Sequence, residues 1–136
     1  MLSTIEDFSG ARVLVVDDWP AMAELLGEVF SSLNAIVTVA DSGPLAIELV
    51  GRRRFDLAIV DLVTHPPDDW NLLQAMRATN PTLLRNTIVL TGHPGLSQTG
   101  RIEDFGAHLV HKPFGLESLR SLCHRILRTA HRRIAG

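Results

Sequence analysis

Five residues with acidic, hydroxyl or ammonium side chains each follow an apolar segment of strand length. They are Asp17, Asp18, Asp61, Thr91 and Lys112. An Asp or Thr at the end of a single strand commonly starts a loop or caps a helix. Four strand ends that all carry such groups make that explanation insufficient for the set. An acid pair, an acid, a hydroxyl and an ammonium group therefore indicate a shared pocket.

Lys112 is the only lysine of the chain, because the other twelve basic residues are arginines. Lysine offers a compact ammonium group on a flexible stem, whereas arginine presents a rigid planar fork. A cramped site that contacts one oxygen atom requires the lysine. The position of Lys112 therefore predicts a buried anionic partner.

Length and charge restrict the remaining classes of function. A chain of 136 residues fits one domain, taken as residues 1–136 with a core of about 12–130. The net charge of −2 gives no general attraction to nucleic acid. Five arginines follow Gly115, but a solvated helix face with cations toward its C-terminal end explains them better. We predict no nucleic-acid binding.

The apolar segments are too short to cross a membrane. No run approaches the roughly 18 apolar residues of a membrane span. Residues 1–10 have neither the basic start nor the apolar stretch of an export signal. The single Cys123 lies in an apolar helical pattern, where a buried small side chain is the default. We therefore expect a cytoplasmic protein without a membrane segment.

Strand-length and helix-length segments alternate along the chain, which predicts a parallel sheet with helices on both faces. The predicted strands cover residues 12–16, 35–40, 57–61, 87–90 and 107–111. The predicted helices cover residues 20–33, 43–52, 70–79, 97–105 and 116–130. In open sheets of this type the functional crevice lies beyond the carboxyl ends of the strands. A strand order of 2-1-3-4-5 brings the polar strand ends together, and the second strand contributes nothing to them.

These motifs resemble the receiver domain of bacterial two-component response regulators, over residues 12–128. The resemblance rests on Asp17-Asp18, Asp61, Thr91-Gly92 and the run from Lys112 through Pro113 to Phe114. Each of these matches is weak alone, but the ordered set is highly specific. The resemblance implies a single doubly wound α/β domain of the flavodoxin-like type, with five parallel strands.

The resemblance implies that Asp61 accepts a phosphoryl group from a phosphohistidine of a partner protein. Asp18 and Asp61 then bind Mg²⁺ directly, Asp17 binds it through water, and the backbone carbonyl of Val63 completes the protein ligands. Mn²⁺ is the alternative metal. Such oxygen ligands suit Mg²⁺, which neutralises charge on the transferring group.

Other positions take their expected roles from the same resemblance. Lys112 and the Thr91 hydroxyl contact the phosphoryl group, and the Lys112-Pro113 peptide bond is cis. Gly92 leaves room for the phosphoryl group, and His93 stands where relatives influence the attacking water.

Two features depart from the family pattern. Leu109 stands where relatives carry the aromatic ring of the switch. The loop after Asp61 is one residue longer, lacks glycine and contains Pro66 and Pro67.

The implied partners are a sensor histidine kinase or histidine phosphotransfer protein and a downstream protein target, with a homodimer as a further option. The implied output surface combines the helix at residues 97–105, the strand at 107–111 and the helix at 116–130, and includes Leu109. The protein is then a phosphoacceptor that catalyses only its own phosphorylation and dephosphorylation. It stands alone or forms part of a longer or hybrid protein.

Two alternative functions remain. One is a phosphohydrolase with an aspartyl-phosphate intermediate, similar to haloacid dehalogenase-like phosphatases. Those enzymes place the nucleophile before the other motifs and a second acid two residues later, whereas here the acid pair comes first and Val63 occupies the second position. The other is a degenerate receiver that acts as an interaction module without phosphorylation.

Overall fold

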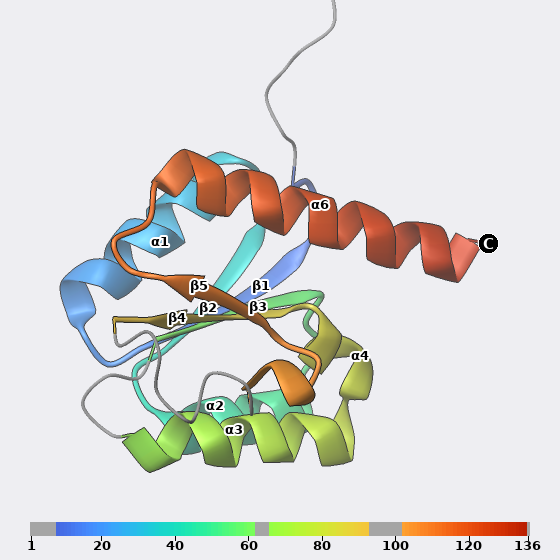
Figure 1. The fold of residues 1–136 in the computed structure, drawn as a ribbon. Coiled ribbons are helices and arrows are strands. Elements are labelled where there is room, and N and C mark those ends of the chain that lie inside the picture. Colours follow the sequence, from blue (N-terminus) through green and yellow to red (C-terminus); the bar gives the residue numbers. More distant parts are fainter. Residues whose placement is uncertain (1–7, 62–65, 93–101, 136) are drawn as a thin grey trace, which may run out of the picture.

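The computed structural model describes residues 8–61, 66–92 and 102–135 (Figure 1). Its strands are β1 (Arg12–Asp17), β2 (Ile36–Ala40), β3 (Leu57–Asp61), β4 (Thr87–Thr91) and β5 (His108–His111). All are parallel and form one sheet in the order β2-β1-β3-β4-β5. The predicted fold class and strand order are thus confirmed.

The strands form because their residues are β-branched or otherwise apolar and are covered on both faces. All five residues of β3 are buried, and so are the last five of β1. Parallel strands enclosed in this way have near-continuous apolar sequences. The two charged residues in these buried runs, Asp17 and Asp61, stand at the carboxyl ends.

The helices are α1 (Pro20–Ser32), α2 (Gly43–Arg52), α3 (Pro66–Thr79), α4 (Pro81–Arg85) and α6 (Leu116–Ala135). Figure 1 shows α1 and α6 on one face of the sheet and α2 and α3 on the other. One buried cluster lies between the sheet and helices α1 and α6 and includes Phe30 and Cys123. A second cluster lies between the sheet and α3 and includes Leu72 and Met76. The sheet is therefore held between two apolar layers.

Proline accounts for two errors in the helix prediction. Helix α3 begins at Pro66 instead of Trp70, and the short α4 follows Pro81, where we expected no helix. Proline is tolerated in the first turn because the N–H groups there have no intrahelical partner. Asn80 caps α4, since its side-chain oxygen accepts a hydrogen bond from the Leu83 amide at 3.0 Å. From the sequence we interpret Pro66 as part of a loop and Pro81 as the end of a helix, whereas each of these prolines begins a helix.

The helix predicted over residues 97–105 lies partly outside the described residues, and only residues 102–104 are seen to be helical. Helix α6 continues to Ala135, five residues past the predicted end. No helix within the described ranges is long and apolar enough to cross a membrane.

The segment before β1 is anchored to the helices of one face. Phe8 is 2% exposed, and its ring meets Phe30 of α1 edge-on with centroids 5.3 Å apart. It also meets His124 of α6 at 5.7 Å. The Phe8 amide donates to the Leu33 carbonyl at 3.0 Å. Residues ahead of the first strand thus belong to the core.

Candidate functional site

The ends of four strands bring the predicted site residues to one edge of the sheet. Asp17 and Asp61 are register partners at the ends of β1 and β3. The Lys112 amide donates a hydrogen bond to the Thr91 carbonyl at 2.7 Å, just beyond the paired ends of β4 and β5. The Lys112-Pro113 peptide bond is cis, as the resemblance implies. Backbone pairing alone therefore gathers acids, hydroxyl and ammonium in one place.

Lys112 makes a direct ion pair with the central acid. Its Nζ atom lies 2.6 Å from Oδ2 of Asp61, whose side chain is 2% exposed. A buried carboxylate needs such a partner, because leaving an unpaired charge out of water is costly. The contact joins one ammonium group to one oxygen atom, which is the geometry that the lone lysine indicates.

Two buried carboxylate oxygens at this edge have no hydrogen-bond partner among the residues that the structure describes. They are Oδ2 of Asp17 and Oδ1 of Asp61. The other oxygen of Asp17 accepts a hydrogen bond from the Trp19 amide at 2.8 Å, and the other oxygen of Asp61 contacts Lys112. Each acid is thus held by one oxygen and leaves the second available to a ligand.

The surroundings of Asp17 raise its pKa to about 6. Burial is the main cause, and the nearby negative charges of Asp61 and Asp18 add to it. The Trp19 amide and the Lys112 ammonium group act in the opposite direction without cancelling the effect. A cation bound at this edge would stabilise the ionised Asp17 carboxylate and so offset the cost of its burial.

The donor set fits a hard divalent cation. Among the described residues, no group of three or more His, Cys, Asp or Glu side chains is arranged to hold a metal ion. Mg²⁺ needs no such group, since it usually takes one or two carboxylates and completes its octahedron with water and phosphate oxygens. The unpartnered oxygens of Asp17 and Asp61, with Asp18 beside them in the chain, fit that requirement.

Of the remaining predicted site residues, the structure describes the surroundings of Gly92 and Leu109. A Cβ atom at Gly92 would lie 3.9 Å from Cδ of Lys112, so this glycine borders the lysine stem. Leu109 on β5 is half-buried and packs against the cluster beneath α3. Val63 and His93 lie outside the described residues.

The role of Trp19 was not predicted from the sequence. Its backbone amide, not its side chain, holds Asp17, and the indole ring is 59% exposed. Every residue except proline has a backbone N–H group, so the residue type at position 19 does not predict this hydrogen bond. It follows from the conformation of the turn after β1.

Comparison with known proteins agrees with this geometry. Residues 13–124 match the family model of the response regulator receiver domain. The chain therefore belongs to this family, whose members are phosphoacceptor modules of two-component signalling.

Two curated relatives illustrate the range of the family. Response regulator MprA of Mycobacterium leprae (strain TN) is 32% identical over 118 residues, covering 86% of this chain and 51% of MprA. The chain thus spans about half the length of that relative. Sporulation initiation phosphotransferase F of Bacillus subtilis (strain 168) is 27% identical over 118 residues, covering 85% and 93% of the two chains.

Solved structures share the fold. A CheY-like receiver domain protein from Methanospirillum hungatei JF-1 has a TM-score of 0.82 at 20% identity and covers 92% of this chain and 99% of its own. The receiver domain of sensor histidine kinase PA1611 from Pseudomonas aeruginosa PAO1 has a TM-score of 0.73 at 24% identity, with 88% and 98% covered. That structure holds a magnesium ion in its active site cleft.

Proposed function

We propose that Asp61 accepts a phosphoryl group from a phosphohistidine of a partner protein. The observation that carries this proposal is the unequal treatment of its two oxygens. Oδ2 is paired with Lys112 at 2.6 Å, whereas Oδ1 is buried and unpartnered. A carboxylate fixed in this way is positioned to attack phosphorus with one oxygen and to bind a metal ion with the other.

In the proposed transfer, an oxygen of Asp61 forms a bond to phosphorus while the bond between phosphorus and the histidine nitrogen breaks. The departing nitrogen keeps the electron pair, and a proton carried by the other ring nitrogen of the phosphohistidine leaves the imidazole neutral. The Lys112 ammonium group contacts the Asp61 carboxylate before the transfer and is close enough to contact a phosphoryl oxygen after it, so it stabilises the negative charge in both states. Thr91 is held beside Lys112, because its backbone carbonyl accepts a hydrogen bond from the Lys112 amide. The Thr91 hydroxyl donates a hydrogen bond to another phosphoryl oxygen.

Asp18 and Asp61 would hold Mg²⁺ directly, Asp17 would hold it through water, and the Val63 carbonyl would complete the protein ligands. When bound, the metal supplies positive charge that offsets repulsion between the carboxylate and the phosphoryl oxygens. Mn²⁺ is expected to serve as well, because it prefers similar oxygen ligands. The coordinated magnesium of the PA1611 receiver domain supports this assignment.

The proposed donor is a sensor histidine kinase or a histidine phosphotransfer protein, and the proposed place of the transfer is the cytoplasm. The phosphorylated state then changes contacts with a downstream protein through residues 97–105, β5 and α6, with Leu109 within this face; homodimer formation is an alternative readout. His93 is proposed to influence the lifetime of the aspartyl phosphate. The protein turns over no substrate beyond its own phosphoryl group.

Intact-mass measurement after incubation with acetyl phosphate and Mg²⁺ tests this function. We expect one hydroxylamine-labile phosphoryl adduct that disappears in EDTA. Multiple turnover of small phosphate esters at a rate typical of phosphatases would instead favour the phosphohydrolase. An unlabelled wild-type protein that still binds its partner would favour an interaction module independent of phosphorylation.

A further inference from the structure

A large groove lies at the end of the sheet opposite Asp61. It has a volume of about 1060 Å³, and its walls come from four separate parts of the chain. These are residues 8–11 before β1, residues 51–56 between α2 and β3, residues around α4, and α6 from His124 to Ala130. The groove therefore lies at the amino ends of β1, β3 and β4, away from the acid pair.

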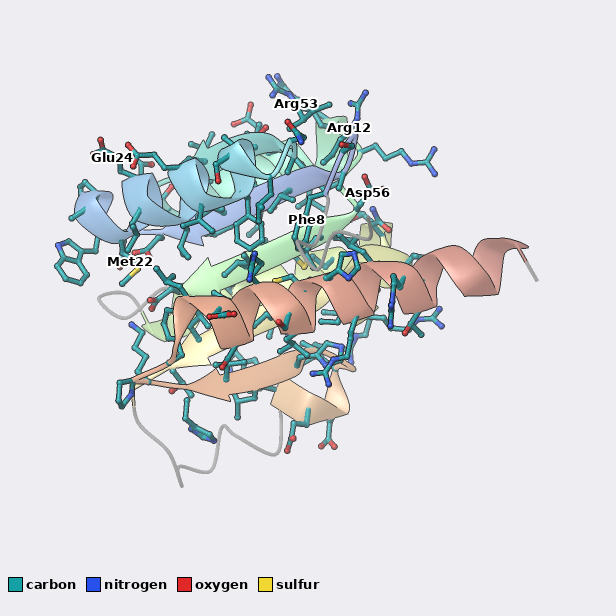
Figure 2. The ribbon with its side chains drawn as sticks, turned by 90° about the horizontal axis from the view of Figure 1, so that it is seen from above. Phe8, Arg12, Met22, Glu24, Arg53 and Asp56 are labelled. Carbon is teal, nitrogen blue, oxygen red and sulfur yellow. The ribbon has the colours of Figure 1, made fainter. Side chains whose placement is uncertain are left out.

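The walls of this groove are strongly basic. Arg52, Arg53 and Arg54 line it from the end of α2, and Arg128 lines it from α6. The acid among its lining residues is Asp56. Figure 2 shows Arg53, Arg12 and Asp56 near Phe8 toward one end of the molecule, and Met22 and Glu24 toward the other. The positive charge of this end is thus concentrated around a concave surface.

Internal contacts do not use most of this charge. Arg52 pairs with Glu48 at 3.3 Å within α2. In the described part of the chain, no hydrogen bond or ion pair engages the guanidinium groups of Arg53, Arg54 or Arg128. The Asp56 carboxylate accepts a hydrogen bond from the Arg12 amide at 2.8 Å. Three guanidinium groups remain available to a ligand.

The chemistry of these groups favours phosphate. Guanidinium forks bind phosphate oxygens with two parallel hydrogen bonds. Charges at consecutive positions on one wall and on the facing helix suit a ligand with several charges within a short length. A polyphosphate chain has that charge density, whereas an acidic peptide in extended form spaces its side chains about 3.3 Å apart on alternating sides. The groove volume of about 1060 Å³ is slightly above the roughly 300–1000 Å³ of small-molecule sites.

We propose that this groove binds a polyphosphate chain, either inorganic or linked to a nucleoside, through Arg53, Arg54 and Arg128. This binding is separate from the phosphoacceptor site. It requires neither Asp61 nor a divalent cation.

Isothermal titration calorimetry with tripolyphosphate and with ATP, each in EDTA at low salt, tests the proposal. We expect one site per chain, weakened roughly tenfold or more in the Arg53→Gln/Arg54→Gln variant through loss of charge-assisted hydrogen bonds. Arg128→Gln weakens binding in the same direction. Tighter binding of ATP indicates a nucleoside contact, and equal binding indicates that the phosphate chain suffices.

The matched control is Arg85→Gln/Arg125→Gln, which removes two exposed arginines from a different cavity of about 290 Å³. The proposal expects nearly unchanged affinity in this control. It is overturned if both double variants lose affinity equally, since that indicates general charge attraction. Absence of binding by both ligands, or tighter binding of a polyglutamate peptide, also overturns it, and the latter assigns the groove to an acidic protein segment. Unchanged circular dichroism of each variant establishes that the fold is retained.

Discussion

The ammonium group of Lys112 lies 2.6 Å from one oxygen of Asp61, and the other oxygen of that carboxylate is buried with no hydrogen-bond partner in the described part of the chain. This relationship links residues that are far apart in the chain through the pairing of β3, β4 and β5. It explains the single lysine, because a compact ammonium group meets one oxygen at a crowded strand end.

Replacing that lysine with arginine tests whether its shape matters. The planar guanidinium fork of Lys112→Arg does not reproduce the single contact to Oδ2, so we expect impaired signalling, with a smaller loss of phosphorylation. Phosphorylation kinetics with acetyl phosphate and partner affinity of the phosphorylated form measure the two effects. An Arg12→Lys variant controls for the exchange at an exposed position at the start of β1, the end of that strand opposite Asp17. Wild-type values for Lys112→Arg in both assays would show that charge alone is required.

Asp17→Asn should stabilise the metal-free protein at neutral pH by roughly 1–3 kcal/mol, because burial raises the pKa of Asp17 from 3.8 to about 6. The folded protein binds more protons at this group than the unfolded chain between about pH 4 and pH 6. Wild-type stability from this group is therefore fully present below about pH 4 and is lost as the pH rises through about 6. Urea denaturation from pH 4 to pH 7.5 measures the difference. A gain that is equally large at pH 4 would contradict this cause.

Leu109 has no aromatic ring to act as the switch, and its half-buried side chain packs against the cluster beneath α3. We expect Leu109→Ala to lower stability by roughly 1–2 kcal/mol and to change partner affinity more than phosphorylation rate. Beryllofluoride, which stands in for the phosphoryl group, should change amide exchange most between residues 92 and 105. Unchanged exchange there, with normal partner binding by the variant, would assign the output to another face.

Phe8 precedes the residues matched by the family model, yet it is almost fully buried between Phe30 and His124. Phe8→Ala should therefore lower the free energy of unfolding by about 3–5 kcal/mol. Phe8→Leu keeps most of the apolar volume and should cost clearly less. Equal stability of wild type and Phe8→Ala in thermal unfolding would show that this segment does not contribute to the core.

The sequence predicts the sheet and its polar edge well, because apolar strand runs and their polar ends are local patterns. Strand ends at Asp17 and Asp61 fall within one residue of the predicted ones. The start of α3 and the existence of α4 were missed because Pro66 and Pro81 serve either to stop or to begin a helix. The basic groove was not predicted, since its walls come from segments that only the tertiary fold brings together.

Direct location of the phosphoryl group tests the central claim. After treatment with acetyl phosphate and Mg²⁺, borohydride reduction converts a phosphorylated aspartate into homoserine, and peptide mass mapping identifies the modified position. We predict homoserine at Asp61, and none at any position in the Asp61→Asn variant or in EDTA. Homoserine at Asp17 or Asp18 in the wild type, or undiminished labelling of Asp61→Asn, would contradict the account.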